Sequence, residues 1–295
     1  MKRKMYALSA SLALCIISVI ILLLSCEKTI TADDESANTI GNLRVTVYQI
    51  EQTPFSSLTR ATASEACTRL NFAVYTSDGT RVKLISQVSS DATFGQCAFQ
   101  LAEGTYQLVV VGHSSSSANP TMTDLSKVQF TNATGYTDTF LCYGEVTIGE
   151  EPLDLRVSLD RIVALCRFVI TDDIPTDVKK MEFYYTGGSG AFDATTGLGC
   201  VNSKQDVKFD VTASQKQFDL YTFLHNIEGT IHLTVTALDA GGNELYKREF
   251  EVPMQQNHIT WLSGDFFNGS GSSSSTTISG VTVNTDWSGE THLTF

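Results

Sequence analysis

Apolar residues alternate with polar ones along most of this chain, and this spacing constrains its fold more than any other feature. Near the start, Leu43, Val45 and Val47 are separated by single polar residues. The same period of two recurs in three later segments, at residues 105–110, 207–211 and 231–237. Successive side chains of a strand point to opposite faces of a sheet. The pattern therefore predicts short antiparallel strands with one buried face and one solvent-exposed face. We expect an all-β fold, with a short helix only at residues 122–130.

The N-terminus has the pattern of a bacterial lipoprotein signal at residues 1–25. Basic residues at 2–4 precede an uncharged run at 7–24, and Ser25 stands directly before Cys26. A small residue before this cysteine allows a peptidase to cleave and leave Cys26 as the lipidated first residue. The alternative is a signal anchor, because the run of 18 residues is near the lower limit of about 17 for a membrane span. Polar sequence begins immediately after Cys26, which favours the lipoprotein.

The sequence therefore predicts a lipid-anchored protein of the cell outer membrane, with residues 26–41 as a polar tether. The chain has 295 residues and a net charge of −12, which makes it a poor partner for nucleic acid. Its composition is that of a globular protein rather than a disordered or fibrous one.

Five cysteines follow Cys26, an odd number for an oxidising compartment. Two bridges and one free thiol would allow 15 pairings, and the sequence does not choose among them. The pattern around Cys166 predicts a buried, unreactive thiol. The five are Cys67, Cys97, Cys142, Cys166 and Cys200.

A change of phase predicts a domain boundary near residue 160. Apolar residues occupy odd positions at 153–159 and even positions at 162–170. One strand cannot present both sets to a single core, so either a bulge lies there or the chain passes into a second sandwich. We favour two β-sandwich domains, at residues 42–159 and 160–267.

Residues 268–277 (NGSGSSSSTT) form a Gly/Ser-rich linker with an expected span of about 16–19 Å. Beyond it, at residues 278–295, Val281, Val283 and Trp287 share one face of another predicted strand. Such a segment has to add to a sheet edge, either in its own molecule or in a neighbour. It is therefore a candidate donor strand.

The chain contains no motif of a known catalytic centre. It lacks GxSxG, HExxH and P-loop patterns, and its five histidines are scattered. Asp172 and Asp173 are adjacent acids, which usually mark a solvated corner, and His232 falls on a polar strand face. We expect no enzymatic activity, no catalytic residue, no metal and no small-molecule cofactor.

A protease site is a further candidate, at Arg60 and Ala61. They lie in a polar stretch between the first predicted strand and the next, where an exposed loop would be open to a trypsin-like protease. Cleavage would release residues 43–51 together with the lipid anchor. The alternative is an ordinary surface arginine.

The ordered set of motifs resembles the FimB-type fimbrial anchor and minor subunit family of the bacteroidal fimbrillin superfamily. The matching residues, beside the lipobox that ends at Cys26, are TRLNFAVYTSDGTRV (68–82), LAEGTYQLVVVGH (101–113), LDRIVALCRFVITDDIP (159–175), NHITWLSGDFF (257–267) and VTVNTDWSGETHLTF (281–295). Together they cover most of the mature chain, and their order is more specific than any one of them.

The resemblance implies two tandem transthyretin-like Greek-key β-sandwiches and a role in fimbriae that assemble by strand exchange. The implied partners are fimbrial shaft subunits and, through the lipid, the outer membrane. As an anchor, the protein would keep its lipid and its first strand; as a shaft or tip subunit, it would lose both by cleavage near Arg60. The alternative from another class is a surface glycan-binding lipoprotein, with Tyr184 and Tyr185 as a wet aromatic platform.

Overall fold

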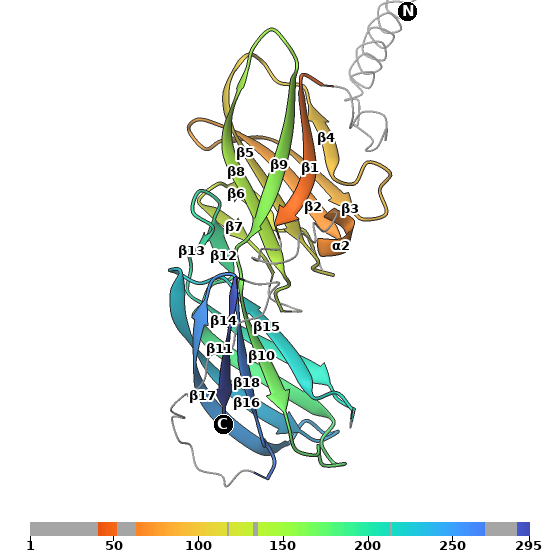
Figure 1. Cartoon of the computed structure of the whole chain (residues 1–295), viewed down its shortest axis with the longest axis vertical. Coiled ribbons are helices and arrows are strands. Elements are labelled where there is room, and N and C mark those ends of the chain that lie inside the picture. Colours follow the sequence, from red (N-terminus) through yellow and green to blue (C-terminus); the bar gives the residue numbers. More distant parts are fainter. Residues whose placement is uncertain (1–40, 52–62, 117, 132–134, 213, 269–287) are drawn as a thin grey trace, which may run out of the picture. The chain divides into compact units, whose positions relative to one another are not determined.

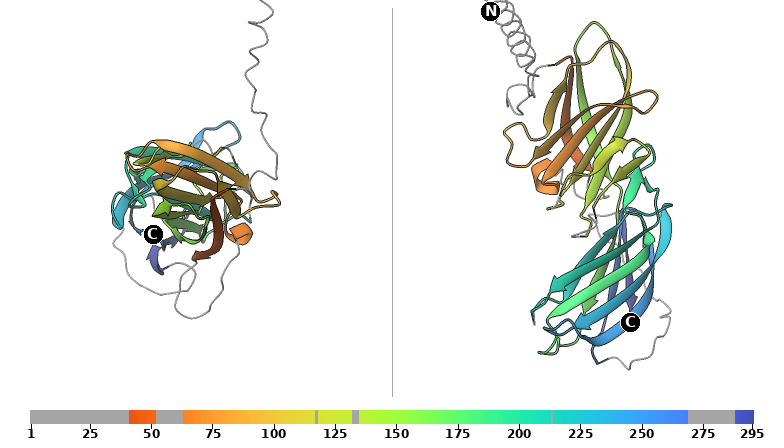
Figure 2. Two further views of the ribbon diagram at one scale, coloured as in Figure 1. Left: turned by 90° about the horizontal axis from the view of Figure 1, so that it is seen from above. Right: turned by 180° about the vertical axis from the view of Figure 1, so that it is seen from behind.

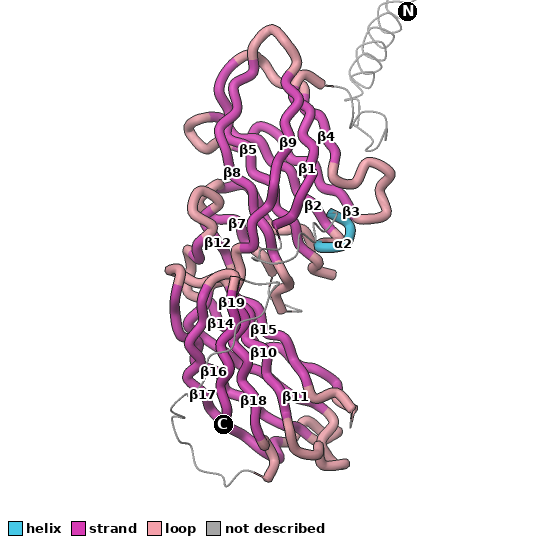
Figure 3. Tube along the Cα trace, in the orientation of Figure 1, coloured by secondary structure: helices cyan, strands magenta, loops and turns pink. Residues whose placement is uncertain are grey.

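The computed structural model describes residues 41–51, 63–116, 118–131, 135–212, 214–268 and 288–295. Strands make up most of this part of the chain, and its helix is the single turn α2 (Ala63–Ala66) (Figure 3). The predicted all-β fold is confirmed. Among the described residues, no helix has the length and apolar character of a membrane span.

All described residues belong to one compact unit. The first described half of the chain forms a seven-stranded sheet, here called sheet I (Figure 1). Its strands, in spatial order, are β3 (Arg81–Val88), β2 (Arg69–Thr76), β5 (Gly104–His113), β8 (Thr139–Ile148), β9 (Leu153–Arg161), β1 (Leu43–Glu51) and β4 (Gln96–Phe99).

Sheet I folds over on itself because β8 and β9 are paired at one end, at Phe140 with Arg161 and Leu141 with Asp160. The strands on the two sides of this corner face each other across a shared apolar core. Leu43, Phe72 and Phe99 are fully buried there. The alternating apolar residues of each strand supply this core, as expected for a β-sandwich.

The second half of the chain forms two four-stranded sheets that face each other (Figure 1, Figure 2). Sheet II has the order β15 (Gln217–Thr222), β10 (Ala164–Ile170), β18 (His258–Gly264) and β19 (Gly289–Thr294). Sheet III has the order β14 (Ser203–Asp210), β11 (Lys180–Gly188), β16 (Glu228–Leu238) and β17 (Glu244–Gln255). Phe168 from sheet II and Phe183 from sheet III meet edge to face, with ring centroids 5.4 Å apart.

A small fourth sheet joins strands from both halves of the chain, because β12 pairs with β7. Its order is β13 (Leu198–Gly199), β12 (Ala191–Asp193), β7 (Lys127–Gln129) and β6 (Thr121–Asp124). A third apolar cluster lies beside it and includes Tyr75, Phe130 and Phe223, all buried.

The structure differs from the sequence prediction at residues 122–130, which form the hairpin β6–β7 rather than a helix. Met122, Leu125 and Val128 are buried at intervals of three, an apolar spacing that two short strands with a tight turn can also produce. The chain leaves sheet I after Arg161 and enters sheet II at Ala164. The division into separate domains at residues 159 and 160 stays a prediction.

All five described cysteines are free thiols, so the structure contains no bridge among them. Cys166 is fully buried, as predicted, and burial raises the pKa of its thiol to about 12. The same effect raises the pKa of Cys67 to about 12. Buried thiols with raised pKa values are poor nucleophiles.

Candidate functional site

The strand β19 is the feature of this fold that most directly suggests a function. It lies at the edge of sheet II and pairs in parallel with β18, from His258 opposite Gly289 to Ser263 opposite Thr294. Parallel neighbours cannot be joined by a tight turn. The connection therefore runs through residues 265–288, most of which lie outside the described ranges.

The inward side chains of β19 and the residue after it complete the core between sheets II and III. Leu293 is 2% exposed, and the ring of Phe295 stacks on Phe168 with a centroid distance of 5.2 Å. The Arg248 guanidinium lies 4.7 Å from the centroid of the Phe295 ring. Burial lowers the pKa of Arg248, because the charged form loses solvent there.

The start of β19 is fixed by contacts with the turn between β17 and β18. The backbone N–H of Ser288 donates to the Asn257 carbonyl at 2.7 Å, and its hydroxyl donates to the same oxygen at 2.6 Å. The hydroxyl oxygen is also 2.7 Å from Nδ1 of His258. Gly289 is required beside it, because a Cβ at this position would overlap the His258 ring.

The same turn is tied to the end of sheet I through Arg161. The Arg161 side chain is 3% exposed and forms a bidentate pair with Asp138, at 2.7 and 2.9 Å. A third guanidinium N–H donates to the side-chain oxygen of Asn257 at 3.3 Å. Asn257 adopts a positive φ of 56°, which asparagine tolerates better than most residues. Arg161 therefore positions the turn that holds Ser288.

The outer face of sheet II carries a row of stacked polar and aromatic side chains. Arg167 forms a bidentate pair with Asp219, at 2.7 Å for both bonds, and lies 4.9 Å from the Trp261 ring centroid. His292 of β19 stacks on the other side of Trp261, with centroids 5.4 Å apart and planes 8° from parallel. Within the described residues, the buried Nε1 of Trp261 has no hydrogen-bond partner.

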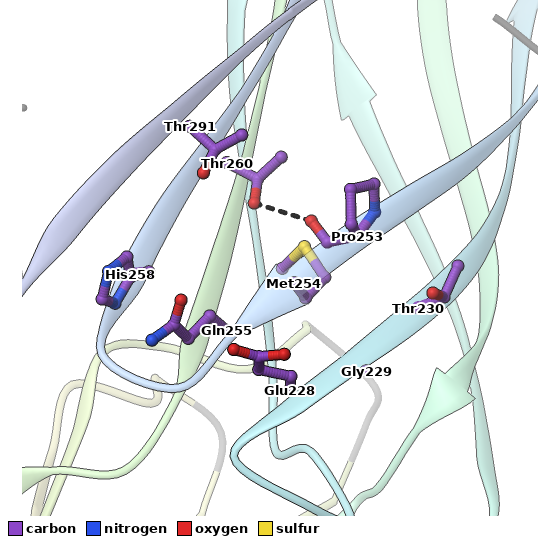
Figure 4. Close-up of a pocket in the computed structure, with 9 residues that line it drawn as sticks. All are labelled: Glu228, Gly229, Thr230, Pro253, Met254, Gln255, His258, Thr260 and Thr291. Atoms are coloured by element: carbon purple, nitrogen blue, oxygen red, sulfur yellow. Dashed lines mark hydrogen bonds between the residues drawn. The ribbon is translucent and has the colours of Figure 1, made fainter. Parts of the chain in front are cut away.

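An open cavity of about 420 Å³ lies between β16, β17, β18 and β19. Figure 4 shows its lining side chains, with His258 and Thr260 from β18 and Thr291 from β19 on one side. Pro253, Met254 and Gln255 of β17 and residues 228–230 of β16 complete it. The Thr260 hydroxyl donates to the Pro253 carbonyl at 2.8 Å, which links sheets II and III across the cavity.

A second candidate feature is the position of β1 inside sheet I. It pairs in parallel with β9 on one side and antiparallel with β4 on the other. Leu43 and Ile50 are fully buried, and Val45 is 1% exposed. Removal of β1 would uncover the facing edges of β9 and β4 together with the apolar core behind them.

Most of the site residues predicted from the sequence lie outside the described ranges. Cys26, the possible processing site Arg60 and Ala61, and the donor-strand residues Val281, Val283 and Trp287 all do so. The described end of the predicted donor segment is β19, and it pairs within its own molecule.

The platform expected at Tyr184 and Tyr185 does not form. Tyr184 is 38% exposed on the outer face of sheet III, whereas Tyr185 is 2% exposed and donates to the Tyr221 carbonyl at 2.9 Å. Adjacent residues of a strand point to opposite faces, so they cannot present two rings to one ligand. His232 is exposed, as predicted, and pairs with Glu251 at 2.6 Å.

Sequence reasoning also missed the role of Asp172. Its carboxylate is 8% exposed and accepts the backbone N–H groups of residues 266, 267 and 268, at 2.7–2.9 Å. It therefore fixes the direction in which the chain leaves sheet II after β18, whereas Asp173 is solvated and pairs with Lys216. Within the described ranges, no cluster of His, Cys, Asp and Glu side chains is placed to hold a metal.

Comparisons with known proteins place the chain in a family and show solved structures with a related architecture. Residues 36–294 match the family described as "Family of unknown function (DUF6562)". No curated protein sequence matches the chain.

Three solved structures illustrate the structural likeness. A candidate adhesin from Bacteroides ovatus is 14% identical with a TM-score of 0.47, over 71% of this chain and 81% of its own. The fimbrial anchor protein Mfa2 from Porphyromonas gingivalis is 12% identical with a TM-score of 0.40, over 70% and 80% of the two chains. A fimbrial assembly protein from Parabacteroides distasonis is 12% identical with a TM-score of 0.39, over 76% and 90%.

Proposed function

The chain belongs to the DUF6562 family, and on that premise we propose that it is a lipid-anchored surface subunit that joins fimbrial subunits by strand exchange. In this role Cys26 carries the lipid in the outer membrane, β1 stays in place, and the segment that contains β19 pairs with a shaft subunit. The function is structural rather than enzymatic. The assignment to the FimB-type family is part of this proposal.

The observation that carries the proposal is the one-sided pairing of β19. It has β18 as its neighbour in sheet II, and its other edge is unpaired within the described residues. A strand on a long connection can leave such an edge and dock at an equivalent edge of a neighbour without loss of backbone hydrogen bonds. Leu293 and Phe295 would then fill the neighbour's core in place of their own.

The position of β1 supports an acceptor site in the shaft or tip form. Its four core-facing side chains, Leu43, Val45, Val47 and Ile50, each stabilise the fold by about 1.5–3 kcal/mol when fully buried. Cleavage at Arg60 and loss of β1 would leave a groove between β9 and β4. An incoming strand could fill it and pair with the free backbone groups of both edges. The anchor form keeps β1, so its groove stays closed and the chain ends the filament.

The two forms are distinguished by intact mass and N-terminal analysis of the protein from its native membrane. An acylated Cys26 start with an uncut chain is the expected result for the anchor. A start at Ala61 would contradict the anchor and identify a shaft or tip subunit.

Strand exchange itself is tested by locking β19 to its own sheet. Ser263 and Thr294 are register partners on β18 and β19. The pair Ser263→Cys and Thr294→Cys places two thiols on neighbouring strands, at a separation that suits a disulfide. A Cys200→Ser background removes the one described thiol that is exposed.

In the oxidised double variant, we expect loss of subunit joining, read as loss of detergent-resistant assemblies at the cell surface. Reduction restores joining, and the Ser263→Cys single variant behaves as the parent protein. Undiminished assemblies with the disulfide formed would rule out β19 as the donor.

A further inference from the structure

Eight of the nine residues that line the cavity between sheets II and III lie outside the proposed donor strand β19. We propose that this cavity binds a neutral polyhydroxylated ligand of the class of a single hexose unit. This inference goes beyond the proposed function and does not depend on it.

The size of the cavity suits such a ligand. Small-molecule sites in proteins enclose roughly 300–1,000 Å³, and this cavity has about 420 Å³. It is open on one side, so one sugar ring can enter while the rest of a chain stays in solvent.

The lining offers hydrogen-bond donors and acceptors that the protein leaves unused. The Glu228 carboxylate, the Gln255 amide and the Thr291 hydroxyl line the cavity, and none has a hydrogen-bond or ion-pair partner in the described ranges. A carboxylate accepts, an amide both donates and accepts, and a hydroxyl does either. Neighbouring hydroxyl groups of a sugar both donate and accept hydrogen bonds, so they require donors and acceptors side by side.

The charges in the cavity disfavour the other ligand classes. Among the described residues that line it, Glu228 and His258 are the only ionisable ones. An anionic ligand would face the Glu228 carboxylate without an arginine or lysine to offset it. A fully apolar ligand would cover polar groups without supplying hydrogen bonds to them.

An apolar surface lies on one side of the cavity. The exposed Pro253 ring supplies it, whereas Met254 is 3% exposed and packs in the core (Figure 4). The C–H face of a sugar ring can pack against the Pro253 ring while its hydroxyls turn to Gln255 and Glu228.

The walls are held in place before a ligand arrives. The His258 ring is fixed by the Ser288 hydroxyl, and the Thr260 hydroxyl is fixed by the Pro253 carbonyl. Both residues stand on a paired strand, so little ordering is required on binding. Thr291 belongs to β19, which means that the lining is complete only when β19 is docked.

Gly229 offers a way to block the cavity with little disturbance. It lines the cavity, and a Cβ there would meet its nearest atom, Cδ2 of Leu224, at an ordinary 3.5 Å. The Cβ itself therefore has room, and the two methyl groups of Gly229→Val add bulk at the cavity wall. Gly144→Val is the matched control, because a Cβ at Gly144 on β8 has no atom within 4 Å.

The experiment is titration of the full chain with D-glucose, D-galactose, D-mannose and L-fucose, followed by ligand-detected NMR. D-glucuronate is the charged counterpart of D-glucose. We expect saturable binding of at least one neutral sugar, loss of this binding in Gly229→Val, and unchanged binding in Gly144→Val. Glu228→Gln should weaken it about tenfold, because one hydrogen bond to a charged acceptor is lost. Glu251→Gln, on the outer face of β17, should leave it unchanged.

Three results would overturn the inference. They are no saturable binding of any of the four neutral sugars, binding that survives Gly229→Val, and binding of D-glucuronate alone. A β19 lock that abolishes subunit joining while sugar binding persists would separate this site from the proposed function. Loss of sugar binding with normal joining would separate them in the other direction.

Discussion

Strand β1 alternates apolar and polar residues, whereas β19 has Leu293 as its one apolar residue, and the fold uses the two strands differently. β1 lies inside sheet I between two neighbours, with Leu43 and Ile50 fully buried. β19 lies at an edge with one neighbour, and its Thr294 and His292 face solvent in part. The sequence predicts a strand in both segments. A strand with neighbours on both sides, such as β1, is held in the sheet, whereas a strand with one neighbour, such as β19, can leave it.

The largest expected effect is in β1. Val45→Asp places a carboxylate in an apolar core at a site that is 1% exposed, and should lower the free energy of unfolding by about 5 kcal/mol. Urea denaturation of the purified chain measures this. Tyr48→Asp on the exposed side of the same strand is the control, with a much smaller loss. Equal losses in the two variants would contradict the interior placement of β1.

Arg161 connects the regions that contain the two strands, so its loss should affect both. Arg161→Met leaves the partly buried Asp138 without its partner and should cost about 4 kcal/mol. Hydrogen exchange should quicken in β19 as well as in sheet I, because Asn257 loses its contact with Arg161. The double variant Arg161→Met with Asp138→Asn should recover most of the stability. Unchanged exchange in β19 would show that the two regions are independent.

Acid should weaken the half of the molecule that contains β1 first. His113 on β5 is fully buried, and burial lowers its pKa from 6.5 to about 4. Between pH 6.5 and 4, His113 is protonated in the unfolded chain but stays neutral in the folded chain. The free energy of unfolding therefore falls as the pH falls through this range. The total loss is about 3 kcal/mol.

Urea denaturation at several pH values measures this slope, and His113→Gln should flatten it. The Asn71 amide, 3.0 Å from Nε2 of His113, gives the glutamine a polar partner. A variant with the same slope as the parent would assign the pH dependence to other groups.

The smallest effect should come from β19. Phe295→Ala removes a half-buried ring from its contact with Phe168 and should cost about 2 kcal/mol, less than a fully buried phenylalanine. Hydrogen exchange should quicken in β19 and stay unchanged in β1. Thr294→Ala, an exposed neighbour, is the control. Faster exchange throughout sheet I would mean that β19 is not a separately opening strand.

Prediction from sequence succeeded where a local pattern determines the structure. Alternation predicted the strands, and the burial of Cys166 and the exposure of His232 followed from the same periodicity. It failed at residues 122–130, where we expected a short helix, because two short strands joined by a tight turn bury the apolar residues there. It also failed at Asp172, because acceptance of three N–H groups from residues 266–268 depends on a contact across more than 90 residues.

The sequence by itself determined the fold class of this protein: an acidic chain of short strands, because net charge and local periodicity are properties of the sequence alone. Only the tertiary structure decided which strands are neighbours. It placed β19 in parallel beside β18, put β1 between β9 and β4, and gathered Glu228, Gln255 and Thr291 around one cavity. The physical reason is that alternation of apolar and polar residues determines which face of a strand is apolar. Which strands pair depends on how those apolar faces pack against segments distant in the sequence.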